Sequence, residues 1–387
     1  MKRLLLVSLL IVFGLLIQAA PIHSQPVASP GAAADTGLPA GGEVIVGCLL
    51  PLSGKYGHVG EKALRGILSA AGQGPGPGGY RLIVKDIGSE GQNIGSALGE
   101  LLAVPGLSFI VGPIPSAYAG AAAEKAGRKK IPIIVFPASE SESRGGPYVV
   151  EFFYPLEEQT KVLSSYAARD LGARTFGILY PETGSGRELA GLFKKAATGS
   201  GGKIVYEKGY PPGETDLSGE TEWIASIKPD AIFIPDGASA SAGLILRLKQ
   251  NPRLSDVLFL GPATWNSPLF LKLAGAEIDG FVYRAVYTDF FHFGDGGWVR
   301  FGKDFESRHG EKPGSFEYLI YSGVSLMLKA AGGDGGDGQS FLKTLEKLAS
   351  SPEYIVKKDK TGSLQITPIP RILSVSRGEI IEIMKVK

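Results

Sequence analysis

Side chains that ligate metals or act as strong nucleophiles are scarce in this sequence. The chain of 387 residues has one cysteine, Cys48, and four histidines, so it cannot form an internal disulfide bond. No CxxC, HExxH or GxSxG pattern occurs, and no glycine-rich motif leads from a strand into a helix as phosphate-binding loops do. We therefore expect no catalytic residue, no metal site and no cofactor.

A surplus of charge is missing too. Lys and Arg together number 40, and Asp and Glu together number 38. Two of the cations, Lys2 and Arg3, lie in an N-terminal segment that we expect to be removed, which leaves 38 charges of each sign. No basic field then exists to attract nucleic acid or anionic lipid. We expect neither as a partner.

Long apolar runs are absent beyond the N-terminus. Lys2 and Arg3 precede the apolar residues 4–17, a pattern that is typical of a secretory signal peptide and shorter than the roughly 20 residues that span a bilayer. We interpret residues 1–24 as a signal peptide and the Pro-, Gly- and Ala-rich residues 25–42 as a flexible leader. The folded part is therefore expected to be periplasmic or otherwise extracytoplasmic, with no membrane insertion once the signal is removed.

From residue 43 onward, short apolar runs alternate with segments of helical periodicity. Such alternation is typical of an α/β fold in which helices cover parallel sheets. The extended segment 147–155 interrupts the rhythm, so two similar lobes are expected to follow each other. Residues 366–387 hold two alternating runs around Arg377-Gly378 and predict a terminal hairpin. The short apolar runs before this terminal segment predict strands at 44–50, 80–86, 107–112, 131–136, 174–180, 203–207, 231–235 and 257–261.

Several fragments resemble the type I periplasmic binding proteins. VGCLLPLSG at 46–54, with a helix soon after it, resembles the first strand and loop of that family, and in particular of the branch that binds leucine, isoleucine and valine. The order and spacing of further fragments extend the resemblance over nearly all of residues 43–387. These fragments are 110–113 (IVGP), 132–137, 148–150, 179–181 (LYP), 230–237, 260–268, 305–310 and 318–328.

This resemblance implies two Rossmann-like lobes with parallel sheets, joined by a three-strand hinge. The N-terminal lobe would comprise residues 43–151 and 281–350, and the C-terminal lobe residues 152–280 and 351–387. The implied function is that of an extracytoplasmic solute-binding protein, without enzymatic activity, that captures an amino acid or a related small carboxylate between its lobes. The implied partner is the membrane permease of an ABC-type importer.

A second branch of the same fold gives an alternative function. PYV at 147–149 with Phe153, IPDG at 234–237 and WNSP at 265–268 resemble the binding-protein-like domains known as penicillin-binding protein activators. That resemblance implies a module that regulates an envelope enzyme and transports no solute.

Three predicted strand-to-helix loops of the first lobe carry hydroxyl groups, those of Ser53, Ser116 and Ser139. In open α/β sheets, ligands bind beyond the carboxyl ends of the strands, beside the free N–H groups of helix N-termini. Hydroxyl and amide groups there suit a carboxylate, and the resemblance implies that Ser116, Ala117, Ala138 and Ser139 hold the α-carboxylate of an amino acid. Structural capping of the next helix is the other interpretation of Ser116.

The second lobe is expected to supply a negative charge, because an unpaired ammonium in a closed cleft costs several kcal/mol. Alignment with the family by eye puts its acidic position at Ala263 and its aromatic wall positions at Val59, Ser185 and Ala238, which are all too small or uncharged. Of these, Ser185 is kept as a predicted ligand-binding residue. Asp236 is the candidate to replace the acid, although it is also a candidate helix cap. The candidates for aromatic walls are Tyr56, His58 and Trp265, of which Trp265 is also a candidate core residue.

Overall fold

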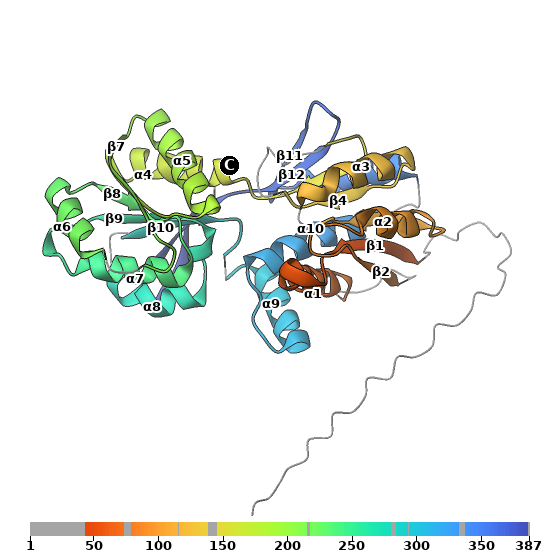
Figure 1. Cartoon of the computed structure of the whole chain (residues 1–387), viewed down its shortest axis with the longest axis horizontal. Coiled ribbons are helices and arrows are strands. Elements are labelled where there is room, and N and C mark those ends of the chain that lie inside the picture. The colour runs from red at the N-terminus through yellow and green to blue at the C-terminus, as the bar shows by residue number, and fades with distance from the viewer. Residues whose placement is uncertain are drawn as a thin grey trace, which may run out of the picture. The chain divides into compact units, whose positions relative to one another are not determined.

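The computed structural model describes residues 43–72, 79–114, 116–137, 145–214, 217–279, 284–292, 294–332 and 337–385. The expected signal peptide and leader lie outside these ranges. Within them, no helix is both long and apolar enough to cross a membrane. The described elements form two seven-stranded sheets, each with helices on both faces (Figure 1). The expected α/β class with two lobes is confirmed.

The first sheet combines strands from both ends of the chain. Its order is β11-β12-β5-β4-β3-β1-β2, and neighbouring strands run parallel except for β11 and β12, which are antiparallel to each other. In Figure 1 the blue β11 and β12 accordingly lie with the red-to-yellow first part of the chain. The strands are β1 (Val44–Leu50), β2 (Tyr80–Asp86), β3 (Leu107–Val111), β4 (Ile133–Val135), β5 (Val149–Phe152), β11 (Tyr354–Lys358) and β12 (Leu364–Pro368).

Alternate residues of β1 enter two different cores, because successive side chains of a strand point to opposite faces of the sheet. Val46 and Cys48 pack with one set of helices, and Ile45 and Leu49 with another. Cys48 is fully buried, so it behaves as a core side chain. The first set is α1 (Gly57–Ala71), α10 (Ser315–Ala331) and α11 (Gly338–Ala349), and the second is α2 (Ile94–Leu102) and α3 (Ala119–Arg128).

The second sheet has a similar order, β14-β13-β10-β9-β8-β6-β7, but β13 is antiparallel to both of its neighbours. Its strands are β6 (Thr175–Pro181), β7 (Lys203–Tyr210), β8 (Ala231–Phe233), β9 (Leu258–Gly261), β10 (Ala285–Asp289), β13 (Arg371–Ser376) and β14 (Glu379–Lys385). On one face lie α4 (Leu156–Arg169) and α5 (Gly184–Gly199). On the other face lie α6 (Ser218–Ile227), α7 (Ala238–Lys249) and α8 (Pro268–Ile278).

The expected terminal hairpin is confirmed. β13 and β14 pair antiparallel, and the turn residues Arg377 and Gly378 have φ of 55° and 74°. Two consecutive residues with positive φ match the two-residue turn that suits the twist of a hairpin. Asp279 secures the turn, because its carboxylate oxygens accept hydrogen bonds from the Arg377 and Gly378 N–H groups, each at 2.7 Å.

Three connections join the two sheets: β5 to α4, β10 to α9 (Gly296–His309), and β12 to β13. At two of these connections, the boundary between the lobes differs from the one expected from the sequence. β10, expected in the first lobe, pairs with β9 and β13 of the second sheet. Residues 351–368, expected in the second lobe, contain β11 and β12, and β12 pairs with β5 of the first sheet. The extended segment 147–155 also contributes more than a connector, since β5 lies inside it.

Candidate functional site

The described residues predicted to bind a ligand lie in the segments that follow central strands of the two sheets, up to the first turn of the next helix. In the first sheet these segments follow the adjacent strands β1 and β3, and in the second the adjacent strands β6, β8 and β9. Carboxyl ends of neighbouring parallel strands share one edge of a sheet, which is where ligands of open α/β sheets bind. Each sheet therefore gathers its own candidates at one edge.

Ser53 lies in the loop after β1, Tyr56 ends the short 3-10 helix Gly54–Tyr56, and His58 lies in the first turn of α1. Ser53 and His58 are exposed, and Tyr56 is half-buried. Asp86, at the end of β2, fixes the loop by accepting hydrogen bonds from the Leu52 and Gly88 N–H groups, both at 2.9 Å. Burial alone would raise the pKa of Asp86, but these bonds and those from Ser53 hold the pKa below its ordinary value. The carboxylate is thus a charged anchor for the loop.

A close backbone contact shapes the first strand-to-helix turn of both sheets. A Cβ atom on Gly60 would lie 2.1 Å from the carbonyl oxygen of Pro51, and one on Gly186 would lie 2.2 Å from the carbonyl oxygen of Pro181. Such distances exclude any side chain at either position. The glycines let α1 and α5 begin tightly against the strands that precede them.

Ser116 and Ala117 belong to a short 3-10 helix, Ser116–Tyr118, after β3. Ser116 is 4% exposed. The 3-10 helix leads directly into α3, whose own N-cap residue is Tyr118, so capping and ligand binding stay the two interpretations of Ser116. Ala138 and Ser139, expected in the loop after β4, lie outside the described residues.

Ser185 lies exposed in the first turn of α5, after β6. Its neighbour Thr183 is the N-cap of α5, and the Thr183 hydroxyl accepts a hydrogen bond from the Gly186 N–H at 3.0 Å. The two hydroxyl oxygens, Thr183 Oγ1 and Ser185 Oγ, are 3.3 Å apart. Thr183 was missed, although a threonine directly before a helix is a recognisable N-cap signal.

Asp236 follows β8 and is half-buried. Its Oδ2 accepts a hydrogen bond from the Tyr210 hydroxyl at 2.7 Å, and its Oδ1 accepts one from the Gly237 N–H at 2.6 Å. Its backbone carbonyl accepts a hydrogen bond from the Thr264 hydroxyl at 2.7 Å. Asp236 precedes α7 but is not its N-cap, which is Gly237. The structure therefore brings Asp236 and Ser185 to one edge of the second sheet.

Trp265 is a core residue and does not form an aromatic wall. It is fully buried and stacks on Phe270, with ring centroids 4.5 Å apart and an interplanar angle of 21°. Tyr287 of β10 lies beside it, at 6.2 Å between centroids. The core interpretation is thus the correct one of the two that the sequence allowed.

Asp289, the last residue of β10, is a fully buried acid that the sequence analysis missed. Its Oδ2 accepts a hydrogen bond from Asn266 Nδ2 at 2.8 Å, and its Oδ1 one from the Phe290 N–H at 2.7 Å. The hydroxyl of Ser315, the first residue of α10, lies 3.4 Å from Oδ2. Burial raises the pKa of Asp289 to about 7, against these hydrogen bonds and the charge of Arg371. In the sequence, the only indication of Asp289 is that a polar residue ends an apolar extended segment.

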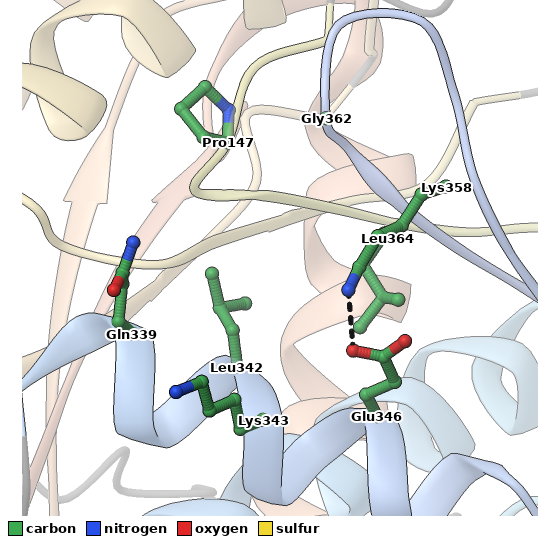
Figure 2. A pocket seen from close by; sticks show the side chains of 8 residues that line it. All are labelled: Pro147, Gln339, Leu342, Lys343, Glu346, Lys358, Gly362 and Leu364. Atoms are coloured by element: carbon green, nitrogen blue, oxygen red, sulfur yellow. Dashed lines mark hydrogen bonds and ion pairs between the residues drawn. The ribbon is translucent and has the colours of Figure 1, made fainter.

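Two hollows in the described part of the chain contain none of the predicted site residues. One, of about 330 Å³, is lined by Phe290, Asp295, Gly296, Gly297, Tyr318, Ser322, Glu353, Tyr354, Pro368 and Arg371. The other, of about 220 Å³, lies between α11 and the β11–β12 hairpin. Figure 2 shows the Lys358 amine beside the Glu346 carboxylate at its margin, a 2.6 Å ion pair. No group of three or more His, Cys, Asp or Glu among the described residues could hold a metal ion.

Comparisons with known proteins agree with the fold. A family model described as periplasmic binding protein matches residues 43–359. The Leu/Ile/Val-binding protein homolog 8 of Brucella abortus is 23% identical over 325 residues, which cover 79% of this chain and 80% of that protein.

Two solved structures have folds similar to that of this chain. A putative branched-chain amino acid ABC transporter from Rhodospirillum rubrum superposes with a TM-score of 0.73 at 21% identity, over 88% of this chain and 99% of that one. A solute binding protein of an ABC transporter from R. palustris, in complex with benzoate, superposes with a TM-score of 0.61 at 19% identity, over 89% and 96% of the two chains.

Proposed function

The chain belongs to the periplasmic binding protein family, and on that premise we propose that it is an extracytoplasmic solute-binding protein of an ABC-type importer. Its ligand would be an amino acid or a related small carboxylate. One similar protein is named for binding leucine, isoleucine and valine, and a similar structure holds benzoate. Both descriptions concern ligands that carry a carboxylate.

Each sheet with its helices would form one lobe of the capturing protein. The lobes then comprise residues 43–152 with 296–368, and residues 156–289 with 371–385, and the three connections between them would form the hinge. The ligand would lie between the two edges that carry the candidate residues. A ligand stabilises a closed arrangement only as far as it binds that arrangement better than the open one.

One observation carries the proposal: both sheets gather polar groups at the edge where their strands end, and the two sets are complementary. The first sheet offers the hydroxyls of Ser53 and Ser116 beside the starts of α1 and α3, which suits a carboxylate. The second sheet offers the carboxylate of Asp236 and the hydroxyl of Ser185. Tyr56, His58, Ala117, Ala138 and Ser139 complete the proposed set, and Trp265 is removed from it.

Isothermal titration calorimetry tests this function. The probes are the twenty standard amino acids, benzoate and 4-hydroxybenzoate, added to the protein one at a time. Useful capture corresponds to a micromolar dissociation constant, or about 8 kcal/mol of binding free energy. We expect at least one probe to bind in that range and Ser116→Ala to weaken it.

Asp230 provides the matched control for this experiment. It lies just before β8, whereas Asp236 lies just after the same strand, so its replacement by Asn should leave ligand affinity unchanged. If none of the probes gave detectable heat of binding, the result would contradict solute capture and would favour the alternative of a module that regulates an envelope enzyme.

A further inference from the structure

Tyr210 holds the Asp236 carboxylate from the far side of an intervening strand. Tyr210 is the last residue of β7 and is 1% exposed. β6 lies between β7 and β8 in the sheet, so the tyrosine side chain reaches past the end of β6 to place its hydroxyl 2.7 Å from Asp236 Oδ2. Burial and the bond to Asp236 raise the pKa of Tyr210 well above its ordinary value. The hydroxyl is therefore a neutral, permanent donor.

Two further contacts fix the backbone and the second oxygen of Asp236. The Thr264 hydroxyl donates to the Asp236 carbonyl at 2.7 Å, and the Gly237 N–H donates to Oδ1 at 2.6 Å. α7 begins directly afterwards, at Ala238, and the positive end of a helix dipole stabilises a nearby negative charge. The carboxylate is thus held in one orientation by neutral groups.

No cation of the described chain balances this carboxylate. The ion pairs made by residues of β7 involve other acids, Glu207 with Lys194 and Glu220 with Lys208, and Asp236 forms none within the described ranges. A carboxylate has about four acceptor sites, of which two are occupied here. A half-buried negative charge with free acceptor sites at a ligand-binding edge suits a positively charged N–H donor.

We propose that Tyr210 is a positioning residue that aims Asp236 at a ligand's ammonium group, so that the pair selects amino acids over carboxylates without an amino group. This inference rests on the proposed capture of a small carboxylate and names the chemical group that the second sheet recognises. The hydroxyl of Tyr210 touches no ligand; it acts by keeping Asp236 in place.

The test compares each amino acid with its des-amino counterpart in the same calorimeter. The pairs are L-leucine with 4-methylpentanoate and L-phenylalanine with 3-phenylpropanoate. Tyr210→Phe keeps the buried ring and removes only the hydroxyl. We expect it to weaken binding of the amino acid about tenfold, as loss of one hydrogen bond to a charged group does, and to change binding of the des-amino acid by less than about twofold.

A second variant and a matched control separate positioning from folding. Asp236→Asn should weaken the amino acid at least as strongly and should abolish the effect of Tyr210→Phe in the double variant, because the two side chains act as one unit. Tyr206 lies four residues earlier on the same strand, and its hydroxyl donates to Glu220 instead. Tyr206→Phe should therefore leave the selectivity between the paired probes unchanged.

The outcomes distinguish this inference from the function on which it rests. Equal weakening of both members of a pair by Tyr210→Phe would show a structural role and overturn the inference. Equal affinity of the unaltered protein for amino and des-amino probes would also overturn it, while capture of a carboxylate would stand. No detectable binding of any probe would overturn the proposed function and the inference together.

Discussion

Replacement of Asp289 by Asn should remove a large pH dependence of the free energy of unfolding. In the unfolded chain an aspartate ionises near pH 3.8, whereas burial raises the pKa of Asp289 in the folded protein to about 7. Between these values the folded state holds one proton more than the unfolded state. The stabilisation is fully present below pH 3.8 and is lost as the pH rises through 7.

The size of the effect follows from the two pKa values. Each pH unit in this window changes the free energy of unfolding by about 1.4 kcal/mol. Between pH 5 and pH 8 the protein should thus lose about 3 kcal/mol that the Asn variant, which has no proton to release, does not lose. The amide changes the hydrogen bonds with Asn266 and Ser315, but that cost is the same at every pH in the window.

Urea unfolding at pH 5, 6, 7 and 8 measures the difference between the protein and its variant. Asp230→Asn is the matched control, since the pKa of Asp230 lies below its ordinary value and its effect should be constant over this range. A carbon NMR titration of the Asp289 carboxyl checks the cause directly. A constant difference across the four pH values, or a carboxyl that titrates near pH 4, would refute the reasoning.

Four further substitutions test the packing and charges that the structure shows. Asp230→Asn should lower the free energy of unfolding by about 1–2 kcal/mol at pH 7, because its carboxylate accepts three hydrogen bonds at 2.8 Å. The loss should fade as the pH falls from about 3.8 through the lower pKa that these bonds give Asp230 in the folded protein. Arg371→Met should cost about 3 kcal/mol in urea unfolding, since this buried guanidinium pairs with three carboxylates. Trp265→Ala should cost about 3–5 kcal/mol without changing ligand affinity, whereas Trp223→Ala, at a side chain that is 62% exposed, should stay within about 0.5 kcal/mol of the unaltered protein. If the Trp265 variant had an unchanged free energy of unfolding but no longer bound the ligand, the interpretation of Trp265 as an aromatic wall would be the correct one.

Local sequence patterns were sufficient for the elements but not for their partners. The apolar run Val44–Leu50 has the bounds of β1, and the turn at Arg377-Gly378 carries its own conformational signal. β10 has an equally clear extended pattern, yet its place in the second sheet depends on hydrogen bonds to β9 and to β13, more than 80 residues away. Periodicity shows that a segment is a strand; it does not show which strand lies beside it.

The candidate site likewise contains residues that could be predicted from the sequence and residues that could not. Topology places the loops after parallel strands at one edge, so Ser53, Ser185 and Asp236 could be named from the sequence. Tyr210 could not, because a tyrosine at the end of a strand looks the same whether its hydroxyl is exposed or donates to an aspartate 26 residues later. Trp265 shows the opposite limit: large aromatic residues suit a core as well as a binding wall, and only its full burial decides.

Under the proposed function, neither sheet alone holds the ligand tightly enough. An exposed ion pair contributes about 0–1 kcal/mol, whereas micromolar capture needs about 8 kcal/mol. The contacts of the two edges must therefore strengthen each other when the ligand is enclosed and water is excluded, since charges attract more strongly at low dielectric.

Enclosure of the ligand between the two edges predicts coupling between Ser116 on the first sheet and Asp236 on the second. For a bound amino acid, the losses caused by Ser116→Ala and Asp236→Asn should not add, because either change already weakens the closed state on which the other contact depends. Calorimetry on the single and double variants should show a coupling free energy above about 0.5 kcal/mol. Additive losses would mean that the two edges bind independently, and capture by closure of two lobes would then have no energetic basis.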